Sequence, residues 1–532
     1  MIGIRVYTDY SILTEIYYIV MTKKRGIAYS VCIVSILGLM SKLVGFLREG
    51  VYSYYLGTSA EADDYFLVYG FFFTISTMVG ISIGTAYLPQ FLETKSKNGI
   101  TQALKECSTL INQVFVITSL LILVCLVFSE PICSMLAPTY STERLQVLSY
   151  YFRSISVILF FSIAVSILGA VFDAEKRYGI SRIIKMLYSV CSILFLVLLF
   201  DWCKMDSLIW AVIISFILQF IISIFGLFRH SYYSLHFKNT NLFKVYKQTI
   251  PVLIGTGTLF FGQIVDRTIA STLQTGAVSA LNYSGILHST INTLFIASII
   301  AVFYTEFSEK FISNQIDKLL SILSRGISML ILILIPISIF CISNSENIIR
   351  ILLQRGAFTE ESVKLTTLAF SFYLLGSPFY GIRDLISRVY YAFQDVKTPM
   401  INGCVTIVIN ILICLSFVYI LNLGVMGITL AASITAVIST SLLLYSLHKK
   451  GYRLHYQDII KGAIQVAVAA VIALILMDYV KRYLLNFHLI IQTMISFFIL
   501  FSTYGMILLL MKNKDVYYIK SVISNKIKHN NN

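Results

Sequence analysis

Apolar runs of about twenty residues follow one another along most of this chain, and their length decides the class of fold. As a helix, each run is long enough to cross the hydrocarbon core of a bilayer. Of the 532 residues, 57% are hydrophobic and only 13% are charged, a composition that excludes a soluble globular protein. The runs do not alternate at period two, which excludes a transmembrane β-barrel. The sequence therefore predicts an all-α polytopic membrane protein.

The runs divide into about fourteen predicted transmembrane helices. They lie at residues 28–56, 65–92, 107–129, 147–171, 181–200, 207–228, 248–273, 277–305, 319–341, 365–391, 400–421, 424–447, 459–480 and 488–511. Alternate loops carry about 25 Lys and Arg on one side and about 7 on the other, so the basic side is predicted to be cytoplasmic. An even number of spans places both termini on that side.

The first residues break this pattern. Residues 1–20 are moderately apolar but interrupted by charges, and are too polar for a good span. Met21, directly before a basic cluster, is the predicted biological start; the alternative is that residues 1–20 lie on the membrane surface as an amphipathic segment. Residues 1–26 are therefore treated as an N-terminal extension.

Two charged stretches, 41–65 and 261–283, look like copies of one another. Superposed, they match Ala62 with Ala280, Tyr65 with Tyr283, and Arg48-Glu49 with Asp266-Arg267. A second pair, 172–180 and 393–401, aligns when Phe172 is placed on Phe393. The first span thus pairs with the seventh and the fourth with the tenth, which gives a repeat unit of six spans.

Six is an even number, so the two halves run parallel and are related by an axis along the membrane normal. The predicted organisation is an N-lobe at 27–230, a C-lobe at 231–450, and two further helices with a cytoplasmic tail at 451–532. A duplicated, charge-bearing span is typical of a transporter built from two related halves.

Charges within the spans are the candidate functional residues, because each costs about 2.5–3.5 kcal/mol in hydrocarbon. Lys42 and Arg48 in the first span point about 120° apart on a helix, so only a wide cavity could use both. An unbalanced basic cavity suits an anionic ligand, and a guanidinium suits a phosphate. The structural alternative is that carboxylates neutralise neighbouring arginines, with these candidates: Glu49, Asp266, and Asp384 beside Arg383 and Arg388.

No pattern indicates an enzyme, a metal site or nucleic-acid binding. The chain has no phosphate-binding loop, no HExxH motif and no nucleophile elbow. Cys and His show no metal-ligand spacing, and the net charge of +15 is spread over short loops rather than gathered on a soluble domain. We expect no cofactor, and transport driven by the membrane potential, a monovalent cation or consumption of the substrate.

Four stretches of the chain match one known family pattern. They are Ser41 to Glu49 with Gly57 and Ala62-Asp63, Val265-Asp266-Arg267 with Val278 to Tyr283, Arg355-Gly356-Ala357-Phe358, and Phe379 to Pro399 with Arg383-Asp384 and Arg388. This resemblance to the MurJ/MviN family of the MOP exporter superfamily covers most of residues 27–450. It implies two six-helix lobes in a V, two extra helices, and alternating access that flips lipid II across the bacterial cytoplasmic membrane.

The resemblance also implies a set of substrate-binding candidates: Lys42, Arg48, Glu49, Asp63, Asp266, Arg267, Arg383 and Arg388. The expected partners are an undecaprenyl-diphosphate-linked glycan, the lipid bilayer and cell-envelope synthesis proteins. This chain departs from the family where paired arginines of the second span fall on Ser76-Thr77, and where a charged pair of the eighth span falls on Gly285-Ile286. Candidates to replace them are Arg267, His288 and Arg325.

These departures leave three transport functions open. The first is flipping of a lipid II-like precursor, and the second is flipping of another lipid-linked glycan, such as a capsule or O-antigen unit. The third is a cation-coupled export of small molecules, for which Asp266 and Glu49 are the acidic candidates. A scaffold or regulator without transport activity is the non-transport alternative.

Overall fold

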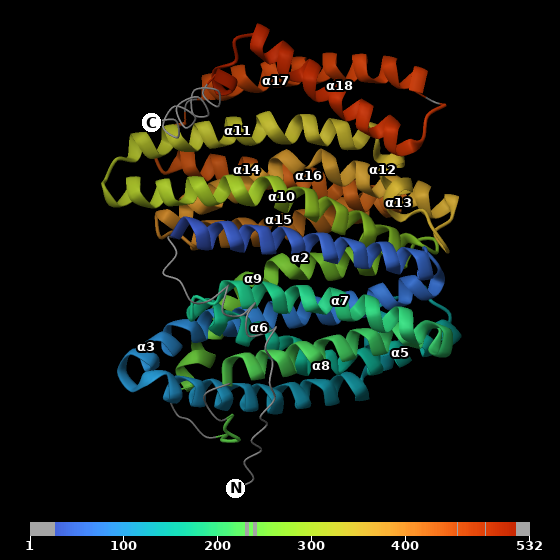
Figure 1. The fold of residues 1–532 in the computed structure, drawn as a ribbon, viewed down its shortest axis with the longest axis vertical. Helices are drawn as coiled ribbons and strands as arrows, with labels where there is room; N and C mark the ends of the chain where they lie inside the picture. Colours follow the sequence, from blue (N-terminus) through green and yellow to red (C-terminus); the bar gives the residue numbers. More distant parts are fainter. Residues whose placement is uncertain (1–26, 229–232, 238–241, 455, 485, 518–532) are drawn as a thin grey trace.

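The computed structural model describes residues 27–228, 233–237, 242–454, 456–484 and 486–517, and within them every regular element is a helix (Figure 1). The predicted all-α polytopic membrane fold is confirmed. The N-terminal extension, including Met21, lies outside the described residues. So does the end of the tail, after residue 517.

The helices of the N-terminal half are α2 (Ile27–Leu56), α3 (Ala60–Val127), α4 (Ser129–Leu136), α5 (Thr142–Ser156), α6 (Ile158–Ala174), α7 (Tyr178–Cys203) and α8 (Asp206–Phe228). Those of the second half are α9 (Leu242–Ser271), α10 (Ala277–Ile312), α11 (Ile316–Ser343), α12 (Ser345–Leu353), α13 (Glu360–Leu375), α14 (Ser377–Ala392), α15 (Lys397–Leu415), η1 (Ser416–Ile420) and α16 (Gly424–Lys449). The appendage consists of α17 (Tyr456–Lys481), η2 (Arg482–Leu484) and α18 (Leu489–Leu510).

Every predicted span overlaps a helix, although the boundaries differ. Within the described ranges, nine helical segments are long and apolar enough to cross a membrane, or eleven if each bent pair counts as one span. Two predicted spans share α3, which turns back at Gly99, where φ is +82°. The Thr94 hydroxyl donates to the Glu106 carboxylate across this turn, at 2.9 Å. The number of fourteen crossings stays a prediction.

The two halves repeat with a spacing of 218 residues. Two turns carry non-glycine residues with positive φ in both halves: Lys176 and Gln394 (58° and 59°), and Lys204 and Asn422 (47° and 53°). The matching of Ala62 with Ala280 has this spacing. The predicted pairing of Phe172 with Phe393 implies a spacing of 221 residues and is therefore wrong by three. That pairing aligned similar side chains, whereas the feature that repeats is the turn that ends each helix.

In Figure 1 the two halves lie one above the other, with α17 and α18 (red) beyond the second half. The α17–α18 pair packs against α11, where the Tyr504 hydroxyl donates to the Leu332 carbonyl at 2.8 Å. Between the halves, α9 packs along α3, and α2 contacts α10 and α12. The structure is therefore two related lobes with an appendage, while the domain limits at residues 230 and 450 stay predictions.

Close packing inside the N-lobe depends on two small residues of α3. A Cβ atom added to Gly80 would lie 2.5 Å from the Cβ of Ser166 in α6, and one added to Gly84 would lie 3.1 Å from the Cβ of Ala170. Small residues at this spacing let two membrane helices approach closely. This GxxxG pair therefore allows the close packing of α3 against α6.

We expect Gly80→Ala to destabilise the protein by about 1–3 kcal/mol, because α3 and α6 must move apart to admit the methyl group. Gly505→Ala in α18 is the matched control: nothing lies within 4 Å of its added Cβ, and alanine favours a helix over glycine. Thermal unfolding of the purified protein measures both. Equal stability of the two variants would show that α3 and α6 do not need this contact.

Candidate functional site

A cavity of about 1100 Å³ lies between the lobes. Its wall comes from α2, α3, α6, α7 and α8 on one side, and from α9, α10, α13, α14 and α16 on the other. The charged side chains that line it are Lys42, Arg48, Lys185 and Arg267, with Asp173 and Asp266. The described wall is therefore basic, and charge of this kind within a membrane protein normally has a ligand or a partner.

Arg48 lies where aromatic rings and a carboxylate hold it in place. Its guanidinium donates to Glu49 at 2.5 Å, and it sits over the rings of Tyr188 at 4.9 Å and Tyr52 at 5.6 Å. The Glu49 residue is 2% exposed and does not line the cavity. Glu49 therefore neutralises and orients Arg48, as the structural alternative proposed, and is not placed to bind substrate itself.

Lys42 and Arg48 line the same cavity although they point in different directions from α2. Lys42 is exposed, and so is Lys185 of α7. Sequence reasoning missed Lys185 as a site residue, because it was counted with the basic residues of a cytoplasmic loop. Its position inside the apolar run 181–200 was the available signal.

Asp266 and Arg267 reach the cavity from α9 but do not form the predicted neutralising pair. Asp266 accepts a hydrogen bond from the Asn410 amide at 3.2 Å, and Arg267 donates to the Thr74 hydroxyl at 3.4 Å. The guanidinium of Arg267 lies against Gly70, where an added Cβ would come within 2.3 Å of it. A side chain at position 70 would displace this guanidinium, which reaches across the lobe interface from α9.

Arg383 and Arg388 do not line this cavity. Arg383 pairs with Asp384 at 3.0 Å, and Arg388 lies 5.8 Å from the ring of Tyr304. Asp384 thus neutralises the adjacent Arg383, as the structural alternative proposed, and not Arg388. Neither arginine is placed to bind a substrate held between the lobes.

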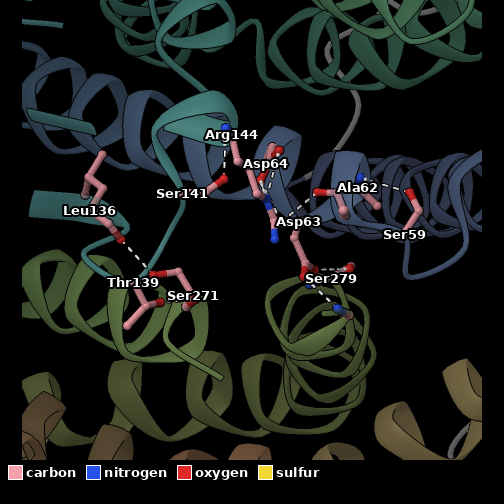
Figure 2. A network of polar contacts seen from close by, with 12 residues as sticks. Ser59, Ala62, Asp63, Asp64, Leu136, Thr139, Ser141, Arg144, Ser271 and Ser279 are labelled. Carbon is pink, nitrogen blue, oxygen red and sulfur yellow. Dashed lines mark hydrogen bonds and ion pairs between the residues drawn. The ribbon is translucent and has the colours of Figure 1, made fainter. Parts of the chain in front are cut away.

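Asp63 has a structural role that the sequence did not predict. It lies near the start of α3 and is 2% exposed, and it accepts from the backbone N–H of Gly276 at 2.6 Å and of Ser279 at 2.8 Å (Figure 2). The Ser279 hydroxyl also donates to it. A carboxylate at a helix N-terminus satisfies unpaired N–H groups and complements the helix dipole. Asp63 thus caps α10 from the other lobe and does not line the cavity.

The lobes meet through main chain at this same end of the molecule. The Ala357 N–H donates to the Tyr54 carbonyl at 2.8 Å. Gly57 and Gly356 lie on either side of this bond with φ near +56°, and a Cβ on either would lie about 2.1–2.2 Å from a carbonyl oxygen of the opposite segment. We call segments 54–57 and 354–358 the glycine latch. The glycine latch joins the two lobes at the end of the molecule where α2 finishes.

Gly356→Ala is expected to open the glycine latch, because its methyl group meets the Tyr54 carbonyl oxygen at 2.2 Å and cannot be accommodated by a side-chain rotation. We expect at least a tenfold loss of transport in proteoliposomes, equivalent to about 1.4 kcal/mol or more. Gly451→Ala is the control, since its φ of +89° is also positive but nothing lies near its added Cβ. If Gly451→Ala loses as much transport as Gly356→Ala, backbone strain rather than the lobe contact accounts for the loss, and normal transport by Gly356→Ala would contradict the prediction.

Of the two remaining candidates to replace the missing charges, one lines the cavity and the other does not. His288 lines the cavity, shares a hydrogen bond with the Asn292 amide at 2.9 Å and stacks on the ring of Tyr373. Arg325 does not line the cavity. The wall also contains Ser76, Thr77, Gly285 and Ile286, so the uncharged departures face the site. No group of three metal-ligating side chains occurs in the described part of the chain.

Two ion pairs brace the basic face that the charge bias predicts to be cytoplasmic. Lys95 of α3 contacts Glu175, at the end of α6, at 2.7 Å. After α14, Asp395 bonds to Lys450 and to the N–H of Thr398. Burial opposes ionisation of Asp395, but the hydrogen bonds from Lys450 and Thr398 outweigh it and hold the pKa of this carboxyl at about 2. Both carboxylates stabilise turns and neither lines the cavity.

Comparisons with known proteins give one consistent result. A family model described as "Lipid II flippase MurJ" matches residues 52–513. The "Probable lipid II flippase MurJ" of Borreliella burgdorferi is 24% identical over 435 residues, which cover 81% of this chain and 85% of that protein. The protein of the same name from Buchnera aphidicola subsp. Baizongia pistaciae is 24% identical over 90% of this chain and 95% of its own length.

Solved structures share the fold. A structure titled as lipid II flippase MurJ in an inward closed conformation superposes with a TM-score of 0.76 at 23% identity, covering 90% of this chain and 99% of that one. An inward-facing multidrug resistance transporter of the MATE family and MOP superfamily gives a TM-score of 0.65 at 13% identity, covering 77% and 94%. At such identities the likeness concerns the fold of the two lobes.

Proposed function

Since the chain belongs to the MurJ family of lipid II flippases, we propose that it carries lipid II, linked through undecaprenyl diphosphate, across the bacterial cytoplasmic membrane. It is a multi-pass membrane protein of a transporter family rather than of a catalytic one. Both termini are proposed to be cytoplasmic, as the charge bias of the loops predicts. Cell-envelope synthesis proteins that make or use the precursor are its proposed partners.

The basic cavity between the lobes is the observation that carries this proposal. Lys42, Arg48 and Arg267 converge on it from two lobes, so a diphosphate can be held between them while the lipid tail stays in the bilayer. Alternating access then requires the glycine latch to separate as the opposite end closes. Glu49 orients Arg48 throughout this cycle.

The driving force is proposed to act on the cavity wall. Asp266 faces the cavity from α9 and bonds to Asn410, and Thr435 donates in turn to the Asn410 amide oxygen at 3.2 Å. A carboxylate in such a polar group is suited to coupling with a monovalent cation, and the basic cavity is suited to sensing the membrane potential. Transport by proteoliposomes with an imposed potential or an imposed cation gradient separates the two.

A second candidate, flipping of another lipid-linked glycan, rests on one observation, although the family favours lipid II. Ser76 and Thr77 line the cavity where the family resemblance expects arginines, and Gly285 and Ile286 line it where a charged pair is expected. Uncharged side chains there change the contacts available to the saccharide but leave the diphosphate contacts of Lys42 and Arg48. The two candidates therefore differ in the glycan and agree on the diphosphate.

Depletion in the native host distinguishes these candidates. If the substrate is lipid II, we expect cells to lyse during growth and to be rescued by the intact gene. If the substrate is a capsule or O-antigen unit, the cells survive and lose a surface polymer. Normal growth with an unchanged surface would contradict both and leave the scaffold alternative.

A further inference from the structure

Lys185 faces the cavity from α7 and has no role in the site described so far. It is exposed, as is Lys42 of α2, and both lysines line the same cavity. In the described part of the chain neither forms an ion pair or a hydrogen bond with another residue. By contrast, Arg48 is held by Glu49 at 2.5 Å.

The two lysines lie near each other because α2 and α7 run side by side and in the same direction. Going toward the glycine latch, Arg48 sits over Tyr188, the Tyr52 hydroxyl bonds to Ser192 at 2.5 Å, and the rings of Tyr55 and Phe200 are 4.3 Å apart. Lys42 lies six residues before Arg48 on α2 and Lys185 three residues before Tyr188 on α7, and the two lysines are close enough for their charges to interact. Arg48 lies about 9 Å further along the axis of α2.

Their surroundings are basic. Lys185 is close enough to Lys42 and Arg182 to be repelled by both charges, and Asp173 of α6 supplies one attraction. Within the described residues no ion pair joins Asp173 to either lysine, and one of its carboxylate oxygens is buried without a hydrogen-bond partner. Asp173 alone cannot offset three neighbouring positive charges, and two ammonium groups close together repel each other unless an anion lies between them.

We propose that Lys42 and Lys185 together form a first binding site for the diphosphate, one lysine for each phosphate, at the end of the cavity away from the glycine latch. The proposal rests on the proposed function and assigns Lys185 to it as a substrate-binding residue. Lysine suits this site because its flexible ammonium can follow a phosphate that is still moving. The guanidiniums of Arg48 and Arg267 are fixed in place and suit a phosphate that is already bound in one position. The diphosphate would then pass from the lysines to the arginines.

A two-lysine site should distinguish a diphosphate from a monophosphate. A monophosphate satisfies one ammonium and leaves the other repelled, whereas a diphosphate spans both. Lys185 would therefore contribute to the preference for a diphosphate lipid, which a lysine that merely sets membrane topology would not affect.

The test uses the full-length protein in lipid nanodiscs, with undecaprenyl diphosphate and undecaprenyl monophosphate as probes and native mass spectrometry as the readout. We expect Lys185→Gln to weaken diphosphate binding about tenfold, the effect of losing one charge-assisted contact, and to change monophosphate binding much less. Arg182→Gln removes a neighbouring positive charge of α7 that does not line the cavity, and should leave both affinities unchanged. The double variant with Lys42→Gln should lose less than the product of the two single effects.

Two outcomes would overturn this inference alone, and a third would overturn the proposed function as well. If Lys185→Gln binds the diphosphate as tightly as wild type while Lys42→Gln does not, Lys185 is not a ligand and only this inference falls. An equal loss for Lys185→Gln and Arg182→Gln would mean that general charge attracts the lipid, and again only the inference falls. If the wild-type protein shows no preference for the diphosphate lipid, the proposed function falls with it.

Discussion

Arg48→Ala is expected to abolish transport and also to destabilise the protein. The substitution removes a guanidinium from the cavity wall and leaves Glu49, which is 2% exposed, as a buried charge without its partner. Breaking a buried ion pair by removing one member costs about 3–5 kcal/mol. We therefore expect no rescue of depleted cells, less protein in the membrane, and a lower temperature of thermal unfolding.

A pair of further variants separates the two effects. In the double variant Arg48→Gln with Glu49→Gln neither member of the pair carries a charge, so we expect the unfolding temperature to recover toward wild type while transport stays absent. Arg48→Lys keeps the charge but loses the planar fork, and should retain part of the transport. Full transport by the stable double variant would show that Arg48 serves folding alone and does not bind the diphosphate.

Asp63→Ala is expected to give the second large loss. Asp63 accepts hydrogen bonds from two backbone N–H groups at the start of α10 and from the Ser279 hydroxyl, across the lobe interface. Its removal leaves buried N–H groups of Gly276 and Ser279 unsatisfied, at about 1–3 kcal/mol for each. We expect the lobes to separate more readily at the latch end, and transport to fall at least tenfold, because the closed state is no longer favoured.

Ser279→Ala is the matched control for this prediction. It removes the hydroxyl donor but leaves both backbone hydrogen bonds to Asp63, so we expect most of the transport activity to remain. Hydrogen exchange at the start of α10 measures the effect directly: protection should fall in Asp63→Ala and persist in Ser279→Ala. Unchanged exchange in Asp63→Ala would contradict the capping role, whatever the transport rate.

Much of the fold could be predicted because it depends on properties that the chain displays locally. Span length and hydropathy predict helices, and the pairing of Ala62 with Ala280 gives the true repeat spacing of 218 residues. The pairing of Phe172 with Phe393 failed because similar side chains need not occupy the same place in a repeated turn. The backbone conformation of Lys176 and Gln394, which identifies the correct register, is not visible in the sequence.

The site was predicted less completely, since it is formed between helices far apart in the chain. Lys42, Arg48, Asp266 and Arg267 were identified from their charge, and all four line the cavity. Asp63 is charged too, but its partners are N–H groups of another lobe, which no side-chain pattern reveals. Lys185 was overlooked because a lysine close to a helix end looks like a loop residue until the depth of the cavity is known.

The glycine latch has a consequence for how the protein responds to ionic strength. The contact joins main chain to main chain, supported by uncharged hydroxyls such as the bond of Thr58 to Ser362 at 2.8 Å, and nearby Asp63 is buried. Salt screens exposed charges far more than buried or neutral contacts. Added salt should therefore weaken capture of an anionic headgroup by the exposed lysines without loosening the closed end. Capture of the headgroup thus depends on the ions in the medium, whereas opening of the glycine latch depends on the size of the residues that meet there. The two steps can be adjusted separately.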